Sequence, residues 1–244
     1  MALLEEQELQ GNWLFRYRGY LPILVLIVGI SLFLYKEAHP ENWIIEGSTY
    51  HQVFESACLM VSLLGLFFRV ITIGYAADNT SGRNTGGQLA ETLNTTGIYS
   101  IMRHPLYVGN FFMWLGIALL TGNAWFIISF ILLFSLYYER IMFAEEQFLR
   151  RKFGSLFTAW AEKTPAVIPN FNLDKPPCQQ FNWKKVLRNE KTGFALLFLT
   201  FFVFDLAGEW IKRSGDINFF LLAGCLMSLS LYLVLKILQK RHLI

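Results

Sequence analysis

This 244-residue chain has few of the side chains that usually hold a resident metal ion, containing only 3 cysteines and 4 histidines. Cys58, Cys178 and Cys225 lie far apart, without the short spacing that zinc and iron–sulfur ligands show. Cys58 and Cys225 fall inside apolar runs, where cysteine acts as a small hydrophobic residue. The chain also lacks a GxGxxG or P-loop spacing, so the Gly-rich stretch 76–88 predicts a cytoplasmic loop and no nucleotide fold. We therefore expect no metal site.

Charge is scarce as well. Charged residues make up 16% of the chain and hydrophobic residues 54%, whereas a soluble domain is about 25% charged. A membrane helix needs roughly 20 apolar residues, with a range of about 17–25. We predict an all-α, polytopic transmembrane bundle of about six spans; the first and fifth runs are short, so five spans is the alternative. The apolar runs are 21–35, 53–75, 107–120, 125–138, 194–206 and 217–238.

Lysine and arginine are concentrated on alternate connecting segments. The densest group lies between Arg140 and Lys191, whereas the opposite side keeps only Lys36, Lys212 and Arg213. This asymmetry predicts a multi-pass protein with a cytoplasmic N-terminus. The net charge of +3 is thus a topology signal, and no nucleic-acid partner is expected. The acidic, polar first ten residues do not resemble a cleavable signal peptide.

Four parts follow from these patterns. Residues 1–75 are expected to form an N-terminal segment and two spans, and residues 76–170 a core that carries the chemistry. Residues 171–192 read as a polar cytoplasmic linker, and residues 193–244 as a final pair of spans.

Polar residues gather at the membrane boundary in two stretches of the core, GIYSIMRHPLYVG (97–109) and EEQFLRRKFG (145–154). Pro105 predicts a turn followed by a helix start. A helical hairpin should then reverse at residues 121–123, and its second helix should continue to Phe153 and stop at Gly154. Ionisable groups beside a membrane are expensive and usually mark a site. The alternative is that Glu145 and Glu146 form a solvated helix face with residues 150–152, and that His104 is structural.

The two stretches resemble the family of isoprenylcysteine carboxyl methyltransferases and their prokaryotic relatives, which include phospholipid methyltransferases. That family's pattern reads G-x-Y-x-x-x-R-H-P-x-Y-x-G, then a helical hairpin, then E-E-x-x-L-x-x-x-F-G and a proline-containing exit. The resemblance covers about residues 88–169. The matching residues here are Gly97, Tyr99, Arg103, His104, Pro105, Tyr107, Gly109, Glu145, Glu146, Leu149, Phe153, Gly154, Pro165 and Pro169.

The resemblance implies a methyltransferase that binds S-adenosyl-L-methionine in a pocket at the cytoplasmic face. The family's carboxyl methyltransferases carry an Arg four residues before the first Glu, where this chain has Ile141, with Arg140 just before it. Carried over position by position, the implied cofactor-binding residues are Glu91, Thr92, Leu93, Tyr99, His104, Pro105, Leu106, Tyr107 and Glu145.

The acceptor is expected to be a membrane lipid or a lipidated substrate. An anionic oxygen needs no general base, whereas an amine would need Glu146 or His104 as a proton acceptor. We assign catalytic roles to Arg103, Arg140 and Glu146, and acceptor binding to Arg83, Asn84 and Arg140. Because the family's prokaryotic relatives include a lipid A 1-phosphate methyltransferase, the resemblance makes the 1-phosphate of lipid A the first choice and favours the bacterial inner membrane as the location. Isoprenylcysteine carboxyl methylation, phospholipid amine N-methylation, and a non-enzymatic scaffold or transporter are the alternatives.

Overall fold

The computed structural model describes residues 2–39, 49–77, 80, 88, 90–213 and 215–241. In these ranges every regular element is a helix. The α-helices, with one 3₁₀ turn η2, are α1 Leu3–Arg16, α2 Tyr20–Ala38, α3 Thr49–Tyr75, α4 Ile98–Ile101, α5 Pro105–Leu120, α6 Ala124–Phe153, α7 Ser155–Ala161, η2 Phe171–Leu173, α8 Trp183–Lys212 and α9 Phe219–Lys240.

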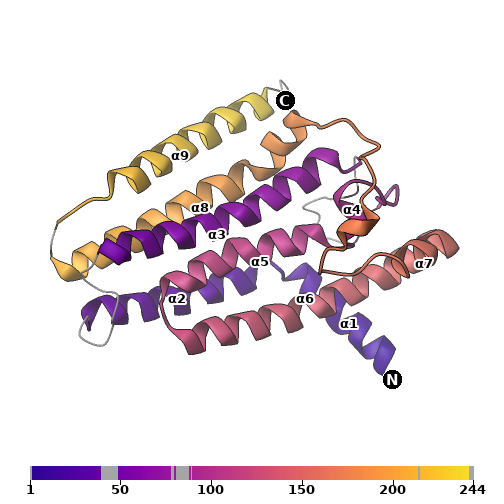
Figure 1. Cartoon of the computed structure of the whole chain (residues 1–244), viewed down its shortest axis with the longest axis horizontal. Helices are drawn as coiled ribbons and strands as arrows, with labels where there is room; N and C mark the ends of the chain where they lie inside the picture. The colour runs from indigo at the N-terminus through magenta and orange to yellow at the C-terminus, as the bar shows by residue number, and fades with distance from the viewer. Residues whose placement is uncertain are drawn as a thin grey trace.

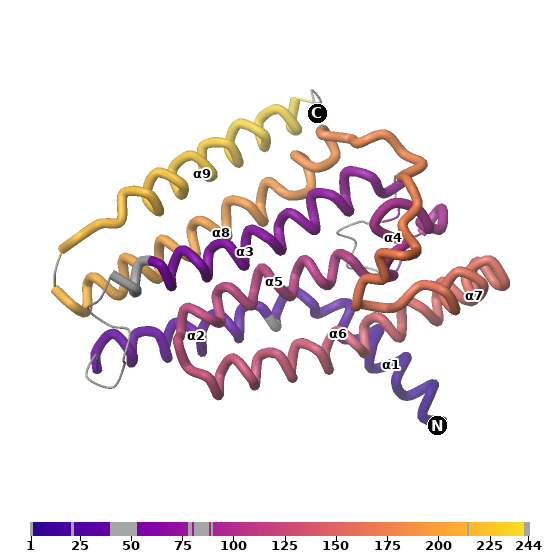
Figure 2. Tube along the Cα trace, in the orientation of Figure 1, coloured from indigo at the N-terminus to yellow at the C-terminus, as the bar shows by residue number. Residues whose placement is uncertain are grey.

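The long helices α2, α3, α5, α6, α8 and α9 run side by side and alternate in direction (Figure 1). Both chain termini, α4 and α7 lie toward one end of the bundle (Figure 2). The connection between α5 and α6 and the connection between α8 and α9 lie toward the other end. This alternation is the arrangement expected for about six crossings that begin and end on the same side.

The described helices are apolar enough for an integral membrane protein. Four of them have the length and composition of membrane spans: Val53–Tyr75 within α3, and the helices α6, α8 and α9. Helix α2 has 19 residues, within the range of about 17–25 that crosses a bilayer. Helix α5 is apolar but has only 16 residues. The fifth apolar run was expected to be short, but it lies within the 30-residue α8, so α5 is the short member.

Helices α3 and α5 approach each other closely at small residues. A Cβ on Gly116 would clash with the backbone at Cys58 and with the Ser62 side chain. The Ser62 hydroxyl donates a hydrogen bond to the Met113 carbonyl at 2.8 Å. Close contact through small residues is how helices associate in a bilayer, where van der Waals packing replaces the hydrophobic effect. It fixes α5, which carries the His-Pro turn at its other end.

Three predicted boundaries of the core are confirmed. Helix α5 begins at Pro105, the hairpin reverses at residues 121–123 with Asn123 capping α6, and α6 ends at Phe153 before Gly154. The expected linker 171–192 differs, because residues 183–192 form the first turns of α8. The Asn182 side chain accepts a hydrogen bond from the Lys185 backbone N–H and starts that helix within the polar stretch.

Candidate active site

The Arg-His-Pro turn is held in place by α7 and by the segment that follows it. The backbone N–H groups of Arg103 and His104 donate to the carbonyls of Pro165 and Ala166, at 2.9 and 3.0 Å. The Trp160 indole N–H donates to the Tyr99 carbonyl at 3.2 Å. The proline-containing exit of the motif therefore lies against the turn and fixes its backbone.

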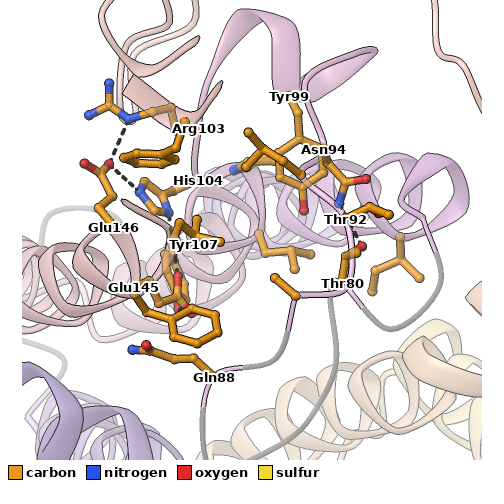
Figure 3. A pocket seen from close by; sticks show the side chains of 18 of the residues that line it. Thr80, Gln88, Thr92, Asn94, Tyr99, Arg103, His104, Tyr107, Glu145 and Glu146 are labelled. Carbon is orange, nitrogen blue, oxygen red and sulfur yellow. Dashed lines mark hydrogen bonds and ion pairs between the residues drawn. The ribbon is translucent and has the colours of Figure 1, made fainter. Parts of the chain in front are cut away.

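Glu145 and Glu146 both face this turn, and each has its own partners (Figure 3). The Tyr107 hydroxyl donates to Glu145 Oε1 at 2.7 Å. His104 Nε2 and Arg103 Nε lie 2.9 and 2.8 Å from Glu146 Oε1. The two halves of the motif, some forty positions apart, thus form one cluster, and the alternative of a solvated face pairing with residues 150–152 is wrong.

His104 is oriented by these contacts. A carboxylate only accepts hydrogen bonds. The Nε2 atom of His104 must therefore carry the proton that faces Glu146. Nδ1 lies 3.8 Å from Glu145 Oε2, and the imidazole stacks on the Tyr107 ring with centroids 5.7 Å apart. The side chain is buried, so its ring position is determined by packing as well as by charge.

Arg103 connects the cluster to the end of α7 and the residues that follow it. Its Nη1 donates to the carbonyls of Ala161 and Thr164 at 2.7 and 2.6 Å, while Nε binds Glu146. Three of the five guanidinium N–H donors are used in this way. Arg103 therefore fixes the cluster from its outer side.

A cavity of about 820 Å³ opens beside the cluster. Small-molecule sites usually measure about 300–1,000 Å³, so the space suits a cofactor together with part of an acceptor. All the residues implied for cofactor binding line it, as do Arg103 and Glu146. In Figure 3, Thr92 and Tyr99 lie across the cavity from Glu145 and Tyr107.

Two expectations about acceptor binding have different outcomes. Arg83 and Asn84 lie outside the described residues. Arg140 is described, but it is not among the residues that line the cavity. Its backbone carbonyl lies against Gly11 of α1, on another side of α6.

Tyr99 contributes a partly buried phenol to the cavity wall. Burial, together with the negative charge of Glu145, raises the pKa of Tyr99 well above its ordinary value. Its hydroxyl therefore stays protonated throughout the physiological range and can donate a hydrogen bond into the cavity.

A second polar group lines the cavity from α3 and α8, and it was not predicted from the sequence. Arg69 of α3 forms a two-point ion pair with Glu190 of α8, with N–O distances of 2.8 and 2.6 Å, and its Nη1 also donates to the Asn110 side chain. Both charged side chains are largely buried, at 17% and 5% exposed. Arg69 interrupts an apolar run, and that was a usable signal, because an ionisable residue inside a span is rarely neutral to function.

The part of the chain that forms this site is similar to known proteins. The family model described as phospholipid methyltransferase matches residues 55–155. The nickel-cobalt-cadmium resistance protein NccN of Alcaligenes xylosoxydans xylosoxydans is 31% identical over 163 residues, covering 66% of this chain and 69% of the relative. The cobalt-zinc-cadmium resistance protein CzcN of Cupriavidus metallidurans is 29% identical over 66% of this chain and 68% of its own length.

A eukaryotic enzyme is also similar. The protein-S-isoprenylcysteine O-methyltransferase of Schizosaccharomyces pombe is 32% identical over 48% of this chain and 50% of its own length. No solved structure matches. The chain belongs to the isoprenylcysteine carboxyl methyltransferase and phospholipid methyltransferase family of integral membrane methyltransferases.

Proposed function

We propose that this chain uses S-adenosyl-L-methionine to methylate an anionic oxygen on a membrane lipid or lipidated acceptor, at the cytoplasmic face. The observation that carries this proposal is the hydrogen bonding of the two candidate bases, Glu146 and His104. Glu146 and His104 are hydrogen-bonded to each other, and Glu146 is also paired with Arg103. An amine acceptor would need one of them to take a proton, whereas a phosphate or carboxylate is already ionised near pH 7.

The residues around the cavity fit the cofactor. Glu145 is a carboxylate held by the Tyr107 hydroxyl, which suits the positive charge of a sulfonium or an amino acid ammonium. The segment Glu91–Asn94 lies along the cavity edge and offers backbone and side-chain polar groups. When bound, S-adenosyl-L-methionine supplies an electrophilic methyl group with a neutral thioether as leaving group.

The protein's own contribution is to position and desolvate the reactants. Tyr107 and Glu145 orient the cationic partner, and the Arg103–Glu146–His104 cluster keeps the turn rigid beside it. Precise placement of two reactants can supply about 7–11 kcal/mol of a barrier. The lining also includes the apolar side chains of Phe148, Leu149 and Phe157, which offer water no hydrogen-bond partner.

The proposed acceptor carries a phosphate or a carboxylate. The matching family model is that of phospholipid methyltransferases, and the S. pombe relative is named for isoprenylcysteine O-methylation. A phosphate, such as the 1-phosphate of lipid A, and an isoprenylcysteine carboxylate share the negatively charged oxygen that this site favours.

Lipid mass spectrometry tests the proposal. Membranes with the active chain should contain a lipid or lipidated species heavier by one methylene group, and labelled methionine should place the label on that group. A Glu145→Gln variant expressed to the same level should lack the species. If no species differs between the two membranes, and purified protein does not bind S-adenosylhomocysteine, the proposed function is wrong.

A further inference from the structure

Helix α1 is docked on the cytoplasmic part of α6, outside the recognised motif. A Cβ on Gly11 would clash with the Arg140 carbonyl and with Ala144, so the two helix backbones are in close contact. The Tyr137 hydroxyl donates to the Leu14 carbonyl at 3.0 Å. In the middle of α1, Glu8 forms a two-point ion pair with Arg151. Helix α1 is therefore fixed relative to the helix that carries Glu145 (Figure 2).

The end of α1 forms part of the cavity wall. Phe15 and Arg18 both line the cavity, and Phe15 is only 7% exposed. The Arg18 guanidinium lies 4.0 Å from the centre of the Phe15 ring, and its Nη1 donates to the Phe15 carbonyl at 3.1 Å. Its positive charge interacts electrostatically with Glu145 and Tyr107. The α1 side of the wall is also connected to Gln88, whose side-chain amide donates to Asn12 at 3.2 Å.

Four described cations line this cavity, and their surroundings differ. Arg103 and Arg69 are each committed to a carboxylate, through Glu146 and Glu190. Lys152 is exposed and lies near the Phe148 and Phe153 rings, toward the cytoplasmic end of α6. A guanidinium carries five N–H donors and can receive two oxygens of one phosphate or carboxylate side by side. Arg18 is the cation that the end of α1 brings to the cavity wall, and Phe15 orients its guanidinium there.

Arg18 also lies at the depth of lipid head groups. It stands between α1 and the first residue of α2, Tyr20, where the chain enters the membrane. Leu9, Trp13 and Tyr17 are exposed on one side of α1, and Tyr20 is exposed just beyond it. An exposed aromatic stripe of this kind is typical of a helix that lies in the membrane interface.

We infer that Arg18, held by α1 between the membrane interface and Glu145, binds the anionic group of the lipid acceptor. This inference rests on the proposed function and gives it a specificity-determining residue. It places the acceptor anion on the α1 side of the cavity and leaves the side of residues 91–99 to the cofactor. The chemistry recognised is a phosphate monoester or a carboxylate on a membrane-anchored chain.

The test uses full-length protein in phosphatidylcholine nanodiscs and compares Arg18→Ala and Arg18→Lys with Arg16→Ala. Arg16 is an exposed arginine on the same helix and does not line the cavity, so it controls for charge and for folding. Three acceptors are offered separately: phosphatidic acid, an S-farnesylcysteine carboxylate and phosphatidylethanolamine. The readouts are kcat/KM for the acceptor, the dissociation constant of S-adenosylhomocysteine and the melting temperature.

We expect Arg18→Ala to lower kcat/KM for the anionic acceptor by about 10–150-fold, the effect of losing one charge-assisted hydrogen bond. S-adenosylhomocysteine affinity and the melting temperature should match those of Arg16→Ala. Arg18→Lys should recover only part of the loss, because an ammonium cannot form the same two-point contact. The acceptor for which kcat/KM falls, phosphatidic acid or the S-farnesylcysteine carboxylate, shows whether the site recognises a phosphate or a carboxylate.

Other outcomes overturn the inference. If Arg18→Ala behaves like Arg16→Ala in every arm, or raises activity on phosphatidylethanolamine, Arg18 does not bind an acceptor anion. An equal loss of S-adenosylhomocysteine affinity would assign Arg18 to cofactor support instead. If the parent transfers no methyl group in any arm, the proposed function fails separately. Native mass spectrometry then measures how much phosphatidic acid the parent and Arg18→Ala each retain. Lower retention by Arg18→Ala would support the inference, and equal retention would overturn it.

Discussion

The Tyr107 hydroxyl, near the start of α5, donates a hydrogen bond to Glu145, near the end of α6, at 2.7 Å. The pair joins the Arg-His-Pro turn to the Glu-Glu element and faces the cavity. A carboxylate in such a place is held ready for a cation, and the proposed cofactor is cationic at sulfur and at its amino group.

Glu145→Gln and Tyr107→Phe should therefore weaken S-adenosylhomocysteine binding. Losing a hydrogen bond to a charged group costs about 1.5–3 kcal/mol, and we expect the larger effect for Glu145→Gln. Titration calorimetry on purified protein measures the change. Glu139→Gln, on an exposed position of the same helix, is the matched control and should leave affinity unchanged. Parent-like affinity in both site variants would remove Tyr107 and Glu145 from the cofactor site.

Arg69 and Glu190 make the second prediction, which concerns stability. Removing one partner of a buried ion pair leaves an uncompensated charge and typically costs about 3–5 kcal/mol. Arg69→Met and Glu190→Met should each lower the melting temperature in detergent, whereas the double variant should recover much of the loss. Glu162→Gln, at an exposed position, is the control. Additive losses in the double variant would show that the pair does not couple α3 to α8.

The residues of the motif could be grouped from the sequence, whereas the other residues that line the cavity could not, for a physical reason. His104, Pro105 and Tyr107 are adjacent, and turn and helix rules place them together. The Arg69–Glu190 pair joins residues 121 positions apart, and only tertiary packing brings them into contact. Arg18 was missed in the same way, because nothing local shows that α1 docks on α6.

The Arg140 assignment differed for a reason that helix geometry already contains. Five positions along a helix of about 3.6 residues per turn correspond to a rotation of roughly 140°. Arg140 therefore points well away from the face of Glu145. Ile141 is one residue nearer to Glu145 in sequence, which puts it closer to the Glu145 face of the helix. It is fully buried, at 0% exposure.

Membrane topology can be tested with a cysteine that the chain already has. Cys178 is exposed near the end of the bundle that carries α4 and α7, whereas Cys58 and Cys225 are buried. The Lys and Arg distribution predicts that this end is cytoplasmic. A membrane-impermeant maleimide should label Cys178 only after the cells are opened. In a Cys178→Ser background, Asp216→Cys should be labelled in intact cells, and labelling of both positions from the same side would rule out the six-crossing arrangement.

The pH dependence of turnover reports the charge of the acceptor. A phosphate or carboxylate loses no proton on methylation, so the rate should stay nearly flat between about pH 6.5 and 8.5. Tyr99 should add no step in this window, because its raised pKa keeps the phenol neutral throughout, and Tyr99→Phe should show the same profile shape as the parent. An ammonium acceptor would instead give a rate that climbs with pH as the amine loses its proton. Initial rates at saturating S-adenosyl-L-methionine distinguish an anionic acceptor from an ammonium acceptor. The buffer keeps the ionic strength constant, because salt alone weakens the interactions of exposed charges. A steep rise that persists in Tyr99→Phe would replace the anionic-oxygen proposal with amine N-methylation.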